Sequence, residues 1–145
     1  MGLFDFFKTK KVIIIIPYEE IHEALDIFTK ESLAMPKMNN PFVVDDERVH
    51  PALFGYFMGA KNQIQKSYQL NEKDISDIYT QYLAKNFADN DMEKAVELLK
   101  YSVDISHTDD CNHCIFVGEH AMKKWLEGGP MSKYAPMGLI RLLND

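Results

Sequence analysis

This chain of 145 residues has little cysteine, no long apolar run and less positive than negative charge. Two cysteines are too few for a disulfide framework, which is the usage expected in a reducing cytosol. The longest unbroken apolar run, 12–17, is far shorter than the roughly 20 residues that a membrane-spanning helix needs. A formal net charge of −6 argues against nucleic acid as a partner, because phosphates require a basic surface.

The start of the chain also lacks the pattern of a secretion signal. Its basic residues follow the first apolar group and no small-residue cleavage site appears, so we expect a cytoplasmic protein. What the chain does contain is typical of a folded domain, with 46% hydrophobic and 12% aromatic residues. We expect a single helical domain over 1–145, made of an amphipathic arm at 1–11 and a body at 12–145.

Helical periodicity and helix-end signals dominate the body. Pro17 can open a helix whose apolar stripe continues to about Pro36, and Pro51 can open a second helix. Asn71 and Asn90 each stand three residues before an acidic residue, which predicts the starts of two further helices.

Two more helices are predicted in the last third of the chain. One begins after the capping residues 108–110 and ends at Gly128, and a short one follows near the C-terminus. The predicted fold class is therefore all-α, a single-domain orthogonal bundle of about six helices. The β-branched run at 12–16 is either a minor extended segment or a tightly buried helix start.

Both cysteines and three of the five histidines lie between residues 107 and 120. At about 100° per residue, Cys111 and Cys114 share the apolar face of this helix with Trp125. His113 and His120 project toward the other side, along with Phe116. Because free cysteine is among the most buried residue types, this arrangement favours thiols packed in the core.

A metal site is the alternative interpretation of the same stretch. Cys111, Cys114 and His107 could share an ion, with a fourth ligand such as His50 from elsewhere. The chain lacks the second pair of ligands that a strong zinc pattern has, and no strand–helix–strand context supports a redox role for the two thiols. We therefore expect no cofactor.

The first residues form an amphipathic arm, with the apolar side chains Leu3, Phe4, Phe6 and Phe7 on one side of a short helix. Gly-Leu-Phe-Asp followed by apolar residues and lysine is similar to the opening of short amphipathic membrane-active peptides. A segment this short binds lipid only marginally. Docking of the aromatic side chains on the body, on a protein partner or on a second subunit is therefore favoured over membrane contact.

Two features of the middle of the chain suggest contacts. Gly55 and Gly59 lie one turn apart, and polar neighbours exclude membrane insertion, so the spacing predicts close approach of another helix or a ligand. Asp45, Asp46 and Glu47 form an acidic cluster that could meet a basic partner.

The sequence contains neither a nucleophilic hydrolase motif nor a glycine-rich phosphate loop. We therefore expect a non-catalytic helical protein that binds a protein partner or itself, as an adaptor, an immunity or inhibitor protein, or an accessory regulator. The alternatives are the metal-binding protein described above and a peripheral membrane protein that attaches through residues 1–11.

Overall fold

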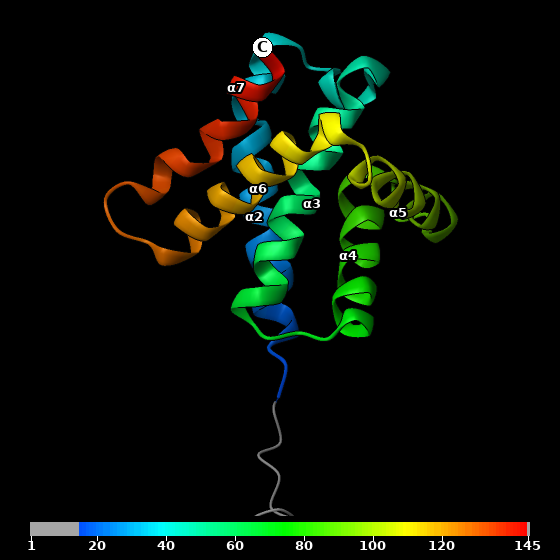
Figure 1. Ribbon diagram of the computed structural model, residues 1–145, viewed down its shortest axis with the longest axis vertical. Helices are drawn as coiled ribbons and strands as arrows, with labels where there is room; N and C mark the ends of the chain where they lie inside the picture. Colours follow the sequence, from blue (N-terminus) through cyan, green and yellow to red (C-terminus); the bar gives the residue numbers. More distant parts are fainter. Residues whose placement is uncertain (1–14, 145) are drawn as a thin grey trace, which may run out of the picture.

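The computed structural model describes residues 15–144, and within this range every regular element is helical (Figure 1). The α-helices are α2 (Tyr18–Asn39), α3 (His50–Ser67), α4 (Glu72–Phe87), α5 (Met92–Ser106), α6 (Asp109–Glu127) and α7 (Gly138–Asn144). Short 3₁₀ helices occur at η1 (Val43–Asp45), η2 (Glu47–Val49) and η3 (Ser132–Met137). The predicted all-α bundle of about six helices is confirmed. The predicted arm and residues 12–14 lie outside the described range, and Ile15 and Ile16 have no regular structure.

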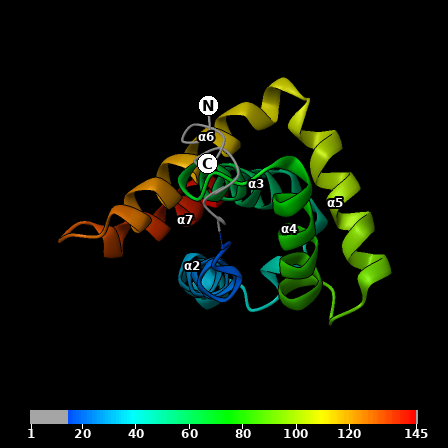
Figure 2. The ribbon, with the colours of Figure 1, turned by 90° about the horizontal axis from the view of Figure 1, so that it is seen from below.

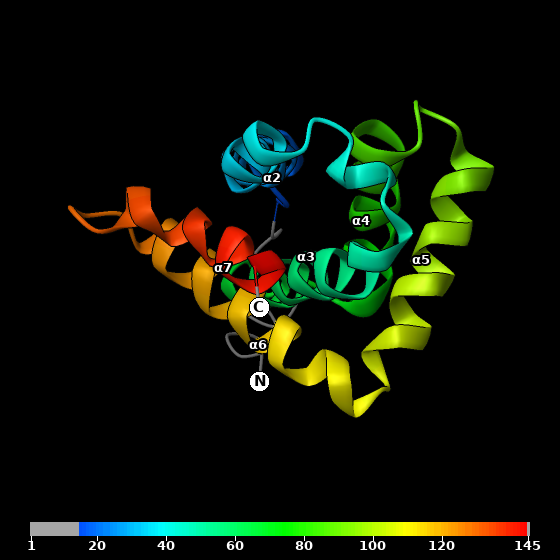
Figure 3. The same cartoon turned by 90° about the horizontal axis from the view of Figure 1, so that it is seen from above.

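Helix α3 is the centre of the bundle, and the other five α-helices pack around it. Its eight consecutive residues from Leu53 to Ala60 are all buried, so side chains on every face of the helix meet protein. A helix that is apolar all round is expected in this position. Seen along the bundle, α5 and α6 form a V around α3, with α5 at one edge of the molecule (Figures 2 and 3).

Helices α3 and α6 cross with their backbones in direct contact. A Cβ atom added to Gly59 would overlap the carbonyl oxygen of Ile115, and one added to Gly118 would overlap that of Tyr56. At Gly55 it would lie 2.7 Å from the Sγ atom of Cys111. The predicted close approach at Gly55 and Gly59 is therefore confirmed, and the partner is a helix of the same chain.

Helix ends follow most of the sequence signals, but Thr108 before α6 makes no side-chain capping hydrogen bond and instead donates to the carbonyl oxygen of Ile105. The Asn71 side chain accepts a hydrogen bond from the Asp74 amide, as predicted, but Asp91 rather than Asn90 caps α5. Asn90 instead has a left-handed φ of 64° in the turn before the cap. The predicted end of the first helix near Pro36 is also wrong, because α2 continues to Asn39. Pro36 is buried in the last turns of α2, where proline removes only one helical hydrogen bond and packing compensates.

Hydrogen bonds between buried hydroxyl groups connect α2 to α4 and to α3. The hydroxyl groups of Thr29 and Tyr82 lie 2.6 Å apart, and those of Ser32 and Tyr56 lie 3.0 Å apart. The hydroxyl of Tyr79, which stacks on Tyr82, has no hydrogen-bond partner within residues 15–144. Burial raises the pKa of Tyr56, Tyr79 and Tyr82 above the usual tyrosine value, which keeps all three hydroxyls neutral.

Candidate functional site

Both cysteines lie in the first two turns of α6, where this helix packs on α3. Cys111 is 2% exposed and its thiol donates a hydrogen bond to the carbonyl oxygen of Pro51 at 3.3 Å, while Cys114 is half-buried. His113 and His120 are exposed on the outer side of the same helix. The inward position of the thiols and the outward position of these imidazoles were both predicted.

The described structure does not bring the predicted metal ligands together. His107 is exposed and follows the end of α5, and no group of three His, Cys, Asp or Glu side chains within residues 15–144 is arranged to hold an ion. His50 lies 2.7 Å from the carbonyl oxygen of Val44 through its Nε2 atom. Burial raises the pKa of both Cys111 and Cys114, which disfavours the thiolate form that metal binding and nucleophilic attack require.

The predicted partner-binding residues are placed only in part. Leu3, Phe4, Phe6 and Phe7 lie outside the described residues. Asp46 caps η2 and accepts two side-chain hydrogen bonds from Arg48, which lower its pKa and partly neutralise its charge. Asp45 and Glu47 remain exposed, so the negative charge that this loop offers to a partner is smaller than its sequence suggests.

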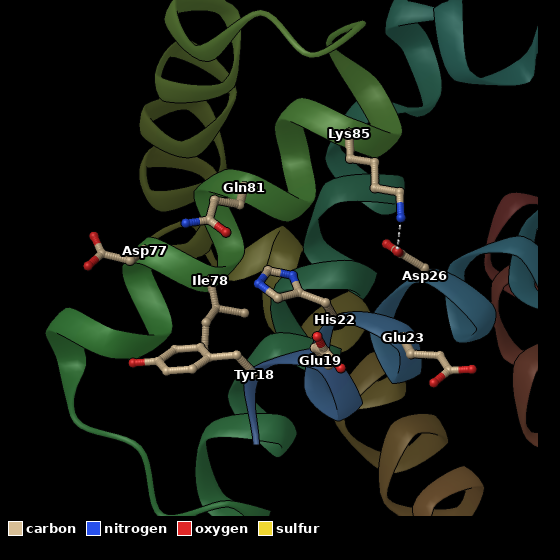
Figure 4. Close-up of a pocket in the computed structure, with 9 residues that line it drawn as sticks. All are labelled: Tyr18, Glu19, His22, Glu23, Asp26, Asp77, Ile78, Gln81 and Lys85. Carbon is tan, nitrogen blue, oxygen red and sulfur yellow. Dashed lines mark hydrogen bonds and ion pairs between the residues drawn. The ribbon is translucent and has the colours of Figure 1, made fainter. Parts of the chain in front are cut away.

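An acidic cleft of about 680 Å³ lies between α2 and residues 77–85 of α4 (Figure 4). Its carboxylates are Glu19, Glu23, Asp26 and Asp77, and Tyr18 and Ile78 supply its apolar surface. Lys85 reaches across from α4 to Asp26 and forms an ion pair with it. Within residues 15–144, the carboxylates of this cleft are not grouped as metal ligands, so the cleft is a negatively charged surface without a metal-binding arrangement.

A second hollow, the α6–α7 groove, has the opposite charge and more apolar lining residues than the acidic cleft. It has a volume of about 440 Å³ and lies between α6, η3 and α7. Phe116, Met131 and Tyr134 line it and are 66%, 67% and 49% exposed, so three large apolar side chains gather at one exposed site. Its remaining lining residues are His113, Val117, His120, Ala121, Lys124, Ala135, Gly138, Arg141 and Leu142.

The charge of the α6–α7 groove differs from that of the whole chain. Its charged lining residues are Lys124 from α6 and Arg141 from α7, and no lining residue is acidic. The Phe116 ring stacks on the imidazole of His120, with 6.1 Å between ring centroids. In a protein of net charge −6, this groove therefore combines exposed aromatic surface with local positive charge.

Sequence reasoning did not identify this groove, although one signal for it was present. Phe116 falls on the polar side of the α6 helical wheel, which is the pattern of an aromatic residue left exposed. The other wall comes from residues 131–142, whose return toward α6 depends on the turn at Gly128 and Gly129. Both glycines have positive φ, and that long-range geometry is not encoded in a local pattern.

Comparison with known protein families, with curated proteins and with solved structures finds no match to this chain. Among the described residues, none of the helices has both the length and the apolar character needed to cross a membrane.

Proposed function

We propose that this protein acts without catalysis by binding a segment of another protein in the α6–α7 groove. The observation that supports this best is the clustering of Phe116, Met131 and Tyr134 around one hollow, all highly exposed. Exposed aromatic and methionine side chains in a concave site are enriched at protein interfaces and carry much of the binding energy. An adaptor, an inhibitor and an accessory regulator would all use such a surface.

The lining defines the kind of segment that fits. Apolar side chains of the partner would pack on Phe116 and Tyr134, and carboxylates would pair with Lys124 and Arg141. The expected ligand is therefore an amphipathic peptide segment that carries aspartate or glutamate. The acidic cleft of Figure 4 supports a partner less well, because it exposes fewer large apolar side chains and its lysine is already paired.

A random peptide library displayed on phage and selected on the folded full-length chain tests the proposal. We expect selected peptides to combine apolar and acidic residues, and to bind more weakly as salt concentration rises. Phe116→Ala and Tyr134→Ala should each weaken binding by about tenfold or more, the usual effect of a central interface residue. Because both side chains are exposed, the variants should stay folded.

Phe42→Ala is the matched control for these variants. Phe42 is 72% exposed but lies in the loop after α2, outside the groove lining, so its replacement should leave peptide affinity unchanged. Selected peptides that bind Phe116→Ala and Tyr134→Ala as tightly as the unaltered protein would contradict the proposal.

A further inference from the structure

The most exposed apolar side chains of the described chain are concentrated in two places. Within residues 15–144, the five most exposed large hydrophobic residues are Met38, Ile15, Phe42, Met131 and Phe116. Phe116 and Met131 line the α6–α7 groove, whereas Met38 and Phe42 belong to the end of α2 and the loop after it. We call residues 38–47 the 38–47 segment. Apolar side chains that gather at the surface mark contact sites, so the groove and this segment are two candidate contact surfaces.

The 38–47 segment has the chemistry expected of a ligand for the groove. Met38 and Phe42 are 83% and 72% exposed, and the carboxylates of Asp45 and Glu47 follow them and are exposed as well. Neither carboxylate forms an ion pair within residues 15–144, and the segment contains no lysine or arginine. It is therefore both apolar and acidic, like the peptide segment proposed above as the ligand.

Contacts within its own chain hold this segment in shape. Val43 is buried and anchors the loop to the body. The Phe42 amide donates a hydrogen bond to the side-chain oxygen of Asn40 at 3.0 Å, and the Asp45 amide donates one to the carbonyl oxygen of Phe42 at 2.9 Å. Phe42 and Asp45 are therefore presented by an ordered loop, which lowers the entropy lost when the loop binds.

The groove offers the complementary surface. Lys124 and Arg141 form no ion pair within residues 15–144 and can pair with the carboxylates of the segment, while Phe116 and Met131 supply apolar surface for Phe42. The groove volume of about 440 Å³ is at the low end of the roughly 300–1,000 Å³ of ligand pockets. A hollow of this size takes a few side chains of one segment rather than a broad folded surface.

The 38–47 segment does not reach the groove of its own chain. None of its residues lines the groove. The chain leaves α2 toward α4, whereas the turn between α6 and η3 lies at the opposite edge of the molecule (Figures 1 and 3). Since the segment is tied at both ends to α2 and α3, only another molecule can bring such a segment to this groove.

We propose that the 38–47 segment of a second copy of this chain binds in the α6–α7 groove. This inference rests on the proposed function, because it uses the same groove and names one occupant for it. The contact joins two different surfaces of the two copies, so it is heterologous. One short segment buries less than the roughly 800 Å² per partner of a stable complex. The association is therefore weak, and an outside partner would compete with it for the groove.

Analytical ultracentrifugation of the full-length chain over a range of concentrations tests the proposal. The mass should rise above 16.8 kDa with concentration, and the rise should be smaller at high salt. Phe42→Lys sets a positive charge against Lys124 and Arg141 and should abolish the rise. Phe116→Glu places a carboxylate in the groove that competes for the same two cations, and it should abolish the rise as well.

Val103→Lys is the matched control for these variants. Val103 is 40% exposed on α5, outside both the groove and the 38–47 segment, so this variant should associate like the unaltered chain. Because Phe42, Phe116 and Val103 are all exposed, circular dichroism should show an unchanged helical fold in each variant. Asp45→Asn combined with Glu47→Gln removes the two carboxylates and should weaken association by about fivefold.

Mixing the two defective variants tests the pairing of segment with groove. Phe42→Lys keeps an intact groove, and Phe116→Glu keeps an intact 38–47 segment. The mixture should therefore form a complex of one copy of each, although neither variant associates alone. A contact between two identical surfaces, either groove with groove or segment with segment, would leave one of the variants able to associate by itself.

A chain that stays monomeric at every concentration, association that survives Phe42→Lys or Phe116→Glu, or a mixture that stays monomeric would overturn this inference. The proposed function is judged separately, by peptide binding at protein concentrations too low for two copies to meet. Selected peptides that bind the groove of a chain without self-association would overturn only the inference. Where both are correct, a selected peptide should dissociate the complex, because it occupies the same groove.

Discussion

Helices α3 and α5 have similar lengths, 18 and 15 residues, but opposite surroundings. Half of α3 is buried, including eight consecutive residues, whereas α5 buries only two small side chains. The sequence of α3 permits this enclosure because its two glycines allow α6 to pack against the helix backbone. Helix α5 has large apolar residues on more than one face, and the described residues 15–144 do not cover them all. The stability of the bundle should therefore depend more on α3 than on α5.

The largest effect is expected from removing equivalent leucine side chains in the two helices. Leu53 of α3 is fully buried, so Leu53→Ala should lower the free energy of unfolding by about 2–5 kcal/mol. Leu98 of α5 is half-buried, and Leu98→Ala should lower it by about 1 kcal/mol. Urea denaturation of both variants measures the difference. Equal losses would show that α5 is as well packed as α3.

The next largest loss of stability is expected from adding a methyl group where α3 and α6 cross. In Gly118→Ala the new methyl group overlaps the Tyr56 carbonyl oxygen, a backbone atom that cannot move alone, so we expect a loss of about 3 kcal/mol. Gly138→Ala is the control, because its nearest neighbour would be the Val117 Cγ1 atom at 3.2 Å, at the end of a side chain. Alanine also favours the helix there by up to about 1 kcal/mol, so the control should be close to neutral. Similar losses in both variants would argue against direct backbone contact.

A smaller loss of stability is expected from removing the hydroxyl groups of two stacked tyrosines, Tyr79 and Tyr82, in the interior beside α3. Tyr82→Phe would leave the buried Thr29 hydroxyl without its partner and should lower the free energy of unfolding by about 1–2 kcal/mol. Tyr79→Phe removes a hydroxyl that has no partner within residues 15–144 and should be neutral or slightly stabilising. Thermal denaturation of the two variants decides the point. If Tyr79→Phe lowered the stability more than Tyr82→Phe did, the Thr29–Tyr82 hydrogen bond would contribute little.

The smallest effect concerns the start of α5. The Asp91 side chain accepts hydrogen bonds from the amides of Glu93 and Lys94 at 3.0 and 3.3 Å, so Asp91→Ala should lower the free energy of unfolding by about 1 kcal/mol. Asn90→Gly relieves a left-handed backbone position and should be neutral or stabilising. If Asn90→Gly were instead the more damaging change in urea denaturation, Asn90 rather than Asp91 would be the cap.

The positions of the helices and the faces that they bury were predictable from the sequence, because both depend on residues that are close together in the chain. The cap at Asn71, the end of α6 at Gly128 and the burial of Cys111 all follow from patterns a few residues long. The start of α5 was missed by one residue because Asn90 and Asp91 are both good capping residues. Only the turn geometry, with φ of 51° at Asp89 and 64° at Asn90, selects the second.

The candidate surfaces were not predictable in the same way. Gly55 and Gly59 indicate a close contact, but the sequence does not show that Cys111 and Ile115 of α6 provide it. The α6–α7 groove requires α7 to return beside α6, and the exposure of α5 requires knowing which helices leave it uncovered. These properties arise from how distant segments pack, so periodicity and capping alone could not specify them.

The glycine contacts between α3 and α6 have a consequence for the outer side of α6. With no layer of side chains between the two backbones at Gly59 and Gly118, α6 cannot slide or tilt without disturbing the central helix. Phe116 and His120, on the outer side, are therefore held on a rigid support. A ligand that reaches them would meet a preorganised wall, so little of its binding free energy would be lost in ordering the protein.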